Sequence, residues 1–130
     1  MKPLLKRMTD DKAPLAMTMG DPAGIGPELA LAAWRDRTSS APFFVFAAPG
    51  VLAAAAKRVG FATPVIETDP AGAAAAFLKG LPVVALKSAV EDAPGCPTAA
   101  NAAATIESIT RAVLTMSSAL NAWAASASGM

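Results

Sequence analysis

The sequence predicts an α/β protein with a mostly parallel sheet. Short runs of apolar, β-branched or aromatic residues alternate with Ala-rich segments of helical composition, and glycine and proline separate them. Read in chain order, the segments give β-α-β-α-β-β-α. Alternation of this kind is typical of parallel strands joined by helices. With 130 residues, the chain is one domain or a part of one.

The first half of the chain supplies two strands and two helices. Residues 14–19 (PLAMTM) form a short apolar run, which predicts a buried strand. Residues 28–37 (ELALAAWRDR) predict a helix, with an acidic residue near its start and arginines near its end. Residues 42–48 (PFFVFAA) have the strongest strand composition in the sequence. Residues 51–59 predict a helix, and Gly60 is a natural C-terminal cap for it.

The second half adds two strands and a long helix. Residues 64–66 and 81–86 read as strands, whereas the Ala-rich segment 69–80 supports no definite assignment. Residues 91–97 (EDAPGCP) form a loop. A helix is expected from residue 98 to at least residue 113. Ile106, Ile109 and Val113 are spaced to lie on one apolar face of that helix.

Composition and charge exclude several classes of protein. The chain is 54% hydrophobic, which rules out a disordered tail. Eleven basic residues against ten acidic ones leave a net charge of +1, so we expect no nucleic-acid partner. The single cysteine fits a reducing compartment. Because the chain has no histidine, it cannot by itself supply a His-based zinc site or a Ser-His-Asp triad.

Neither end of the chain reads as a membrane or export signal. The first twelve residues (MKPLLKRMTDDK) hold only a brief apolar stretch before charges return, so we expect a cytoplasmic protein with an N-terminal tail at 1–13. Residues 112–130 carry no charge. They contain six Ser, Thr or Asn side chains among many alanines, which disfavours a membrane span.

The segment GDPAGIGPE, residues 20–28, lies between the first strand and the first helix. Ligands of open α/β sheets bind beyond the carboxyl ends of strands, where this loop is expected. Its glycines let a ligand approach the backbone, and the helix start behind it suits a phosphate or a carboxylate. The candidate ligand-binding residues are Gly20, Asp21, Gly24, Gly26 and Glu28.

Spacing alone favours a simpler interpretation, in which the same segment is a structural strand-to-helix turn. No Gly-Lys-Ser/Thr follows, so the segment is not a Walker loop. Prolines interrupt the glycines, so it is not a GxGxxG fingerprint either.

Two longer strings resemble a known family. MTMGDPAGIGPELAL and, at residues 94–113, PGCPTAANAAATIESITRAV are similar to the N-terminal part of the 4-hydroxythreonine-4-phosphate dehydrogenase family, over about residues 15–113. The resemblance implies part of an α/β/α sandwich like that of isocitrate and isopropylmalate dehydrogenases. It also implies a cytoplasmic homodimer that acts in pyridoxal phosphate biosynthesis. The implied substrate is a phosphorylated four-carbon amino acid, which is oxidised by NAD or NADP and then decarboxylated. The resemblance also implies a divalent metal that polarises the reacting oxygen.

The rest of the family pattern has no match in this chain. Members are much longer, and their substrate- and metal-binding histidines have no counterpart here, so no catalytic or metal residue is carried over. We divide the chain into a tail (1–13), a dehydrogenase part (14–113) and a segment unlike the family (114–130). The chain is expected to be a fragment, inactive alone and without a tightly bound cofactor or metal. Alternatives are a dehydrogenase for a related four-carbon phosphate, and a non-catalytic anion-binding or oligomerisation module.

Four further residues favour structural roles. Cys96 has no base nearby in the sequence and is expected to be an inert loop cysteine. Trp34 and Trp123 lie in apolar helical segments and are expected to pack in a core or an interface. Glu107 is expected to be solvated and paired with Arg111, four residues later on the same helix.

Overall fold

The computed structural model describes residues 14–128, with the side chains of Ser39 and of residues 119–128 left out. The predicted tail at 1–13 therefore lies outside the described residues. The described chain forms a parallel four-stranded sheet in the order β1-β2-β4-β3. The strands are β1 (Leu15–Thr18), β2 (Phe43–Ala47), β3 (Val65–Glu67) and β4 (Leu81–Ala85). The predicted α/β class with a parallel sheet is confirmed.

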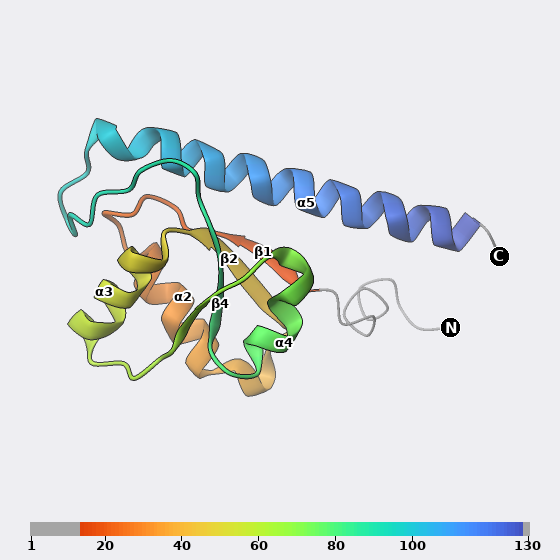
Figure 1. The fold of residues 1–130 in the computed structure, drawn as a ribbon, viewed down its shortest axis with the longest axis horizontal. Helices are drawn as coiled ribbons and strands as arrows, with labels where there is room; N and C mark the ends of the chain where they lie inside the picture. The colour runs from red at the N-terminus through yellow and green to blue at the C-terminus, as the bar shows by residue number, and fades with distance from the viewer. Residues whose placement is uncertain (1–13, 129–130) are drawn as a thin grey trace.

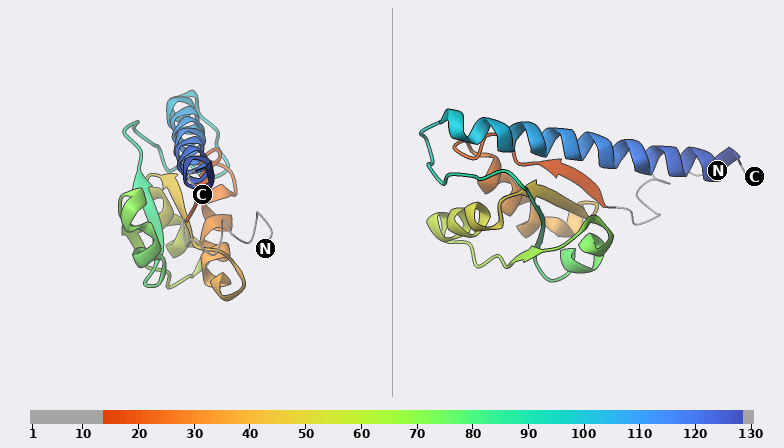
Figure 2. Two further views of the ribbon diagram at one scale, coloured as in Figure 1. Left: turned by 90° about the vertical axis from the view of Figure 1, so that its right-hand side faces the viewer. Right: turned by 45° about the horizontal axis from the view of Figure 1, so that its top comes forward.

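Four α-helices connect and cover the described strands (Figure 1). They are α2 (Gly26–Arg35), α3 (Pro49–Val59), α4 (Ala73–Phe77) and α5 (Ala102–Ser128). Short 3-10 turns at Arg37–Ser39, Pro70–Gly72 and Ala99–Asn101 lead out of α2 and into α4 and α5. The long helix α5 crosses β1 and β2 and continues past the end of the sheet (Figure 2).

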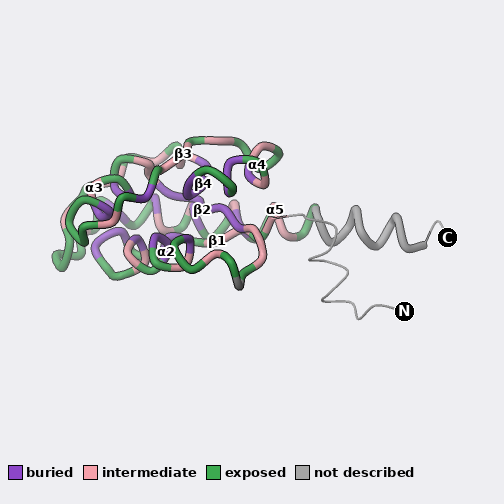
Figure 3. Tube along the Cα trace, turned by 90° about the horizontal axis from the view of Figure 1, so that it is seen from below, coloured by how far each residue is buried: buried purple, intermediate pink, exposed green. Residues whose placement is uncertain are grey.

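The central strand β2 is buried on both faces, as a strand between two helical layers must be. Phe43, Val45 and Ala47 join the core beneath α2 and α3. Phe44 and Phe46 face the other way, into the core beneath α5. Figure 3 shows the resulting buried centre, with exposure confined to the periphery of the fold. The chain is therefore a partial α/β/α sandwich.

Helix boundaries differ from the sequence prediction in ways that local chemistry explains. Helix α2 begins at Gly26 and ends at Arg35, earlier than the predicted 28–37, because Pro27 already adopts the first helical turn. Asp36 then leaves the helical conformation. Helix α3 ends at Gly60 in the left-handed conformation (φ +73°), which confirms the predicted cap. The unassigned segment 69–80 contains α4, which is missing from the predicted order.

The predicted apolar face of α5 is turned away from the sheet. Ile106, Ile109 and Val113 are 63%, 48% and 58% exposed. The face that packs on the sheet carries small residues at four-residue intervals instead, namely Ala104, Ser108 and Ala112. Small side chains let the helix lie close over the two phenylalanine rings of β2. The helical periodicity was predicted correctly, but the stripe that is buried is Ala104, Ser108 and Ala112.

Helix α5 also includes most of the uncharged run that begins at Ala112. It continues without a break across the predicted boundary at 113/114. Within the described residues, no helix is both long enough and apolar enough to cross a membrane.

Candidate functional site

The glycine-rich loop follows β1 and leads directly into α2, so it lies beyond the carboxyl end of its strand. Met19, just after the strand, is buried, and the chain turns sharply at Gly20, whose φ is +72°. A residue with a side chain rarely adopts that conformation. The loop is therefore located as the sequence predicts, and Gly20 has a conformational reason to be glycine.

Asp21 shapes the loop from within. One oxygen of its carboxylate accepts the N–H of Ala23 at 2.9 Å, and its carbonyl accepts the N–H of Gly24, also at 2.9 Å. Side chains of this type commonly close such turns. Pro22 and Ala23 are buried beneath the turn, whereas the Asp21 side chain is exposed. The carboxylate thus holds the turn while remaining accessible to solvent.

Gly26 is required for close packing. A Cβ atom at this position would overlap the carbonyl oxygen of Met19, so the first turn of α2 lies directly against the end of β1. No side chain caps this helix at its N-cap residue, Ile25. The backbone N–H groups of the first turn are consequently not satisfied by a capping side chain.

Glu28 belongs to a charged cluster behind the loop. Its Oε1 lies 3.5 Å from the guanidinium of Arg58, whose other nitrogen lies 3.0 Å from Asp92. The second oxygen, Oε2, is buried and has no hydrogen-bond partner in the described chain. Arg58 therefore joins α3 to the loop after β4 and to the first turn of α2. Sequence reasoning did not connect Arg58 and Asp92 with the loop, because both are distant from Glu28 in the chain.

The two segments that carry the family resemblance meet in space. The N–H of Gly95 donates to the carbonyl of Ala23 at 2.8 Å, so the PGCP turn rests on the glycine-rich loop. Asn101, buried at the start of the last helix, accepts the N–H of Glu91 at 2.8 Å and donates to its carbonyl at 3.1 Å. Segments about seventy residues apart in sequence thus form one edge of the fold.

Glu107 is not the solvated side chain expected from its helical position. Its two oxygens accept the N–H groups of Lys87 and Ser88 at 2.8–3.0 Å. The predicted pairing with Arg111 is confirmed at 3.1 Å. Burial alone would raise the pKa of Glu107, but the hydrogen bonds outweigh it and lower the pKa to about 2. A carboxylate held this way anchors the loop that follows β4.

The other residues singled out from sequence have the expected surroundings, where these are described. Trp34 is buried, and its indole N–H donates to the carbonyl of Phe77 at 2.9 Å. Cys96 is an exposed free thiol in its loop. The side chain of Trp123 lies outside the described residues.

The carboxylates near the loop do not assemble a metal centre. In the described part of the chain, no three His, Cys, Asp or Glu side chains come close enough together to hold a metal ion. The chemistry of the donor set agrees, since the whole chain lacks histidine. A divalent metal of the kind implied by the resemblance therefore does not fit the residues present here.

The parallel sheet with a glycine-rich turn between β1 and α2 places the chain among the open-sheet α/β proteins. Comparison with known proteins goes further, although no family model matches the chain. A 4-hydroxythreonine-4-phosphate dehydrogenase of Methylorubrum populi is 49% identical over 110 residues. Proteins of the same name from Xanthobacter autotrophicus and Bradyrhizobium diazoefficiens are 39% identical over 103 residues and 37% identical over 110.

These matches cover 82%, 78% and 77% of this chain, but only 32%, 29% and 32% of the respective relatives. Over the matched stretch, the chain belongs to the 4-hydroxythreonine-4-phosphate dehydrogenase family. It spans about a third of the length of these relatives.

Proposed function

We propose that this chain is the N-terminal α/β part of an NAD- or NADP-dependent dehydrogenase. The substrate is 4-phosphohydroxy-L-threonine, oxidised with decarboxylation in pyridoxal phosphate biosynthesis. The observation that carries the proposal is the 49% identity to the Methylorubrum populi dehydrogenase over 110 residues. The meeting of the glycine-rich loop and the PGCP turn at one edge of the fold supports it.

Within this proposal, the loop contributes a surface for a ligand's anionic group. Gly20 leaves the backbone open to close approach, whereas Gly24 packs against the carbonyl of Asp21. The uncapped first turn of α2 presents N–H groups and a positive dipole end, which favour a phosphate or a carboxylate. The accessible Asp21 side chain is suited to a hydroxyl or an ammonium group. Glu28 and Gly26 act behind this surface, by charge pairing and by close packing.

The remaining parts of the activity require residues that this chain does not contain. NAD or NADP would accept the hydride, and a divalent metal would polarise the reacting oxygen when bound. We propose that the metal-binding residues are supplied by segments beyond the stretch matched here. We therefore propose that the chain alone is inactive and binds neither group tightly. The complete protein would be a cytoplasmic homodimer.

A chimera tests this proposal directly. The matched stretch of the Methylorubrum populi dehydrogenase is replaced by the corresponding stretch of this chain. Reduction of NAD or NADP is then followed with 4-phosphohydroxythreonine as substrate. We expect activity comparable to that of the unmodified relative. A chimera that folds and assembles like its parent but does not turn over this substrate would contradict the proposal.

A substrate panel separates the alternatives. Preference of the chimera for a phosphorylated erythronate or threonate would identify a related four-carbon-phosphate dehydrogenase. Failure with every substrate, together with an intact fold, would favour the non-catalytic module.

Two variants of the chimera test the role of the loop. Asp21→Asn should impair turnover, whereas the matched control Asp69→Asn should not. Asp69 is exposed and its carboxylate accepts an N–H in its own turn before α4, far along the chain from the loop.

A further inference from the structure

A hollow lies at the opposite end of α2 from the glycine-rich loop. It has a volume of about 440 Å3 and is bounded by the end of α2 and by the connection between α3 and β3. Its lining residues include Trp34, Arg35, Arg37, Phe61, Ala62 and Thr63. This size falls within the range of pockets that bind small molecules. The two strings that carry the family resemblance, residues 17–31 and 94–113, do not line this hollow.

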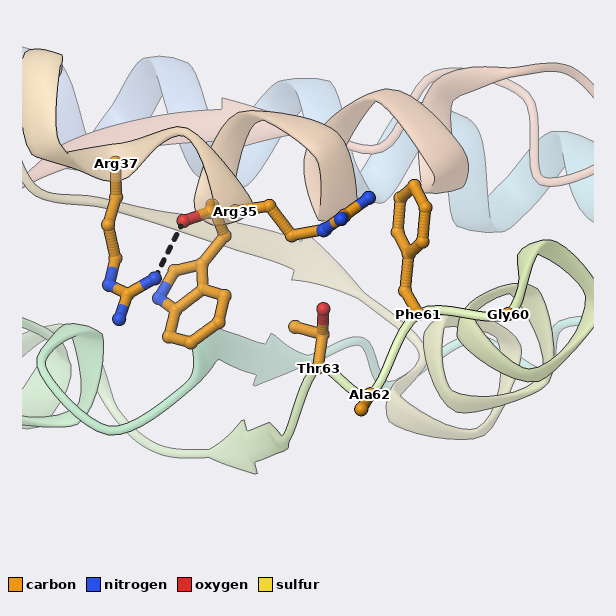
Figure 4. A pocket seen from close by; sticks show the side chains of 7 residues that line it. Arg35, Arg37, Gly60, Phe61, Ala62 and Thr63 are labelled. Atoms are coloured by element: carbon orange, nitrogen blue, oxygen red, sulfur yellow. Dashed lines mark hydrogen bonds between the residues drawn. The ribbon is translucent and has the colours of Figure 1, made fainter.

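Two arginines at the hollow are held in place by aromatic rings. The guanidinium carbon of Arg35 lies 4.0 Å from the centre of the Phe61 ring, and that of Arg37 lies 3.8 Å from the Trp34 ring. Arg37 also donates to the carbonyl of Trp34 at 3.3 Å. Stacking fixes the planes of the guanidinium groups but leaves N–H groups at their edges available. Figure 4 shows the two side chains extending in different directions along the hollow.

Neither Arg35 nor Arg37 belongs to the ion pairs of the described chain, and Asp36, which lies between them in sequence, has an interaction of its own. Within the residues that the structure describes, the arginine ion pairs involve Arg58 and Arg111 only. Arg35 and Arg37 thus bring two positive charges to one concave surface. An anion bound there would meet oriented donors without displacing an existing ion pair.

Thr63 adds a polar atom to the wall of the hollow. The residue is only 9% exposed, yet its hydroxyl makes no hydrogen bond to any group in the described chain. Figure 4 shows its oxygen pointing across the hollow toward α2. The Thr63 oxygen is not among the buried unpartnered atoms of the described chain, so solvent reaches it from the hollow. A ligand in the arginine-lined hollow could therefore pair with this hydroxyl in place of water.

We propose that this hollow binds a small organic dianion, with carboxylate or phosphate groups toward the two arginines and a polar atom at the Thr63 hydroxyl. Two separated guanidinium groups match a molecule with an anionic group at each end. The rings of Trp34 and Phe61 form apolar walls for its carbon chain. This site is separate from the proposed dehydrogenase function, because it lies at the other end of α2.

Tryptophan fluorescence tests the site, because Trp34 is one of only two tryptophans in the sequence. Trp123→Phe leaves Trp34 as the sole reporter. This chain is titrated with succinate at constant ionic strength, and with succinamide, a neutral molecule of similar shape. We expect saturable quenching or enhancement with succinate and none with succinamide. An equal response to both, or no response to succinate, overturns the proposal.

Variants of the lining residues locate the site. Arg35→Gln and Arg37→Gln should each weaken succinate binding about tenfold or more, the usual effect of losing a charged hydrogen bond. Lys87→Gln also removes one positive charge, from the loop after β4, and should leave binding unchanged. Unchanged binding in both arginine variants, or an equal loss in the lysine variant, overturns the assignment.

Thr63→Val separates a binding role from a structural one. The substitution preserves shape and removes the unpartnered hydroxyl, so the empty protein should unfold at the same or a higher temperature. Succinate binding should nevertheless weaken about three- to tenfold. Unimpaired binding would remove Thr63 from the site. Binding of hexaglutamate peptide without binding of succinate would overturn the small-molecule proposal in favour of an acidic protein segment.

Discussion

The Ser108 hydroxyl on α5 donates a 2.7 Å hydrogen bond to the carbonyl of Phe46 at the end of β2. The same oxygen accepts the N–H of Met19, just before the glycine-rich loop, at 3.1 Å. Ser108 is completely buried. One side chain therefore joins the last helix to the ends of two neighbouring strands and positions the start of the loop.

Removing this link should be costly. Ser108→Ala leaves the N–H of Met19 and the carbonyl of Phe46 buried without a partner, so we expect a loss of about 1–3 kcal/mol in the free energy of unfolding. Urea denaturation followed by circular dichroism measures the change. Ser117→Ala, on an exposed position of the same helix, is the control and should have little effect. Equal stability of the two variants would contradict this role.

Glu107 should make stability depend on acidity. Its pKa in the folded chain is about 2, below the ordinary value of 4.5, so its stabilising contribution is complete above pH 4.5. That contribution is lost as the pH falls from about 4.5 toward 2. Glu107→Gln should therefore flatten the decline of stability over this interval, as measured by urea unfolding at several pH values. Glu67→Gln, an exposed change on β3, should leave the decline unaltered.

Two glycines at helix starts should respond oppositely to alanine. Gly26→Ala places a methyl group against the carbonyl of Met19, and we expect destabilisation of about 1–3 kcal/mol from overpacking. Gly50→Ala, in the first turn of α3, meets no atom within 4 Å and should stabilise by about 0.4–1 kcal/mol. Thermal unfolding of both variants distinguishes them. A harmless Gly26→Ala would show that the approach of α2 to β1 is not tight.

The exposed apolar face of α5 should promote self-association. Ile106, Ile109 and Val113 present a stripe on the outside of the helix. We expect the purified chain to self-associate at roughly tens of micromolar, and the double variant Ile106→Lys and Val113→Lys to reduce this. Light scattering provides the measurement. Thr110→Lys with Ser117→Lys adds the same charge at exposed polar positions and should have a smaller effect.

The chain alone should show no dehydrogenase activity. A hydride-transfer site must hold cofactor and alcohol within about 3–3.5 Å of each other, and this chain matches only about a third of the length of its relatives. The assay supplies 4-phosphohydroxythreonine, NAD or NADP, and Mg, Mn, Co or Zn, and follows absorbance of the reduced nicotinamide. Turnover that depends on metal and persists after host dehydrogenase is excluded would refute this prediction. Two copies would not help, since both lack the same segments.

Local features of the sequence were sufficient for the fold class and for the place of the loop. Aromatic and β-branched residues mark Phe43–Ala47 as a strand. Gly60 ends a helix because glycine adopts a positive φ more readily than other residue types. Gly20 and Pro27 likewise mark where β1 ends and α2 begins. These signals act within a few residues, so they can be read directly from the chain. The role of the loop in binding a ligand stays a prediction.

Only the tertiary structure decided which side chains meet. Periodicity identified an apolar stripe on α5, but packing against the sheet selected the small residues around Ser108, because they permit closer approach to Phe44 and Phe46. Arg58 joins Glu28 to Asp92 across three elements, and Glu107 binds a loop about twenty residues earlier in the chain. Local sequence patterns do not predict such pairs, because the interactions form only when the fold brings distant groups within hydrogen-bonding distance.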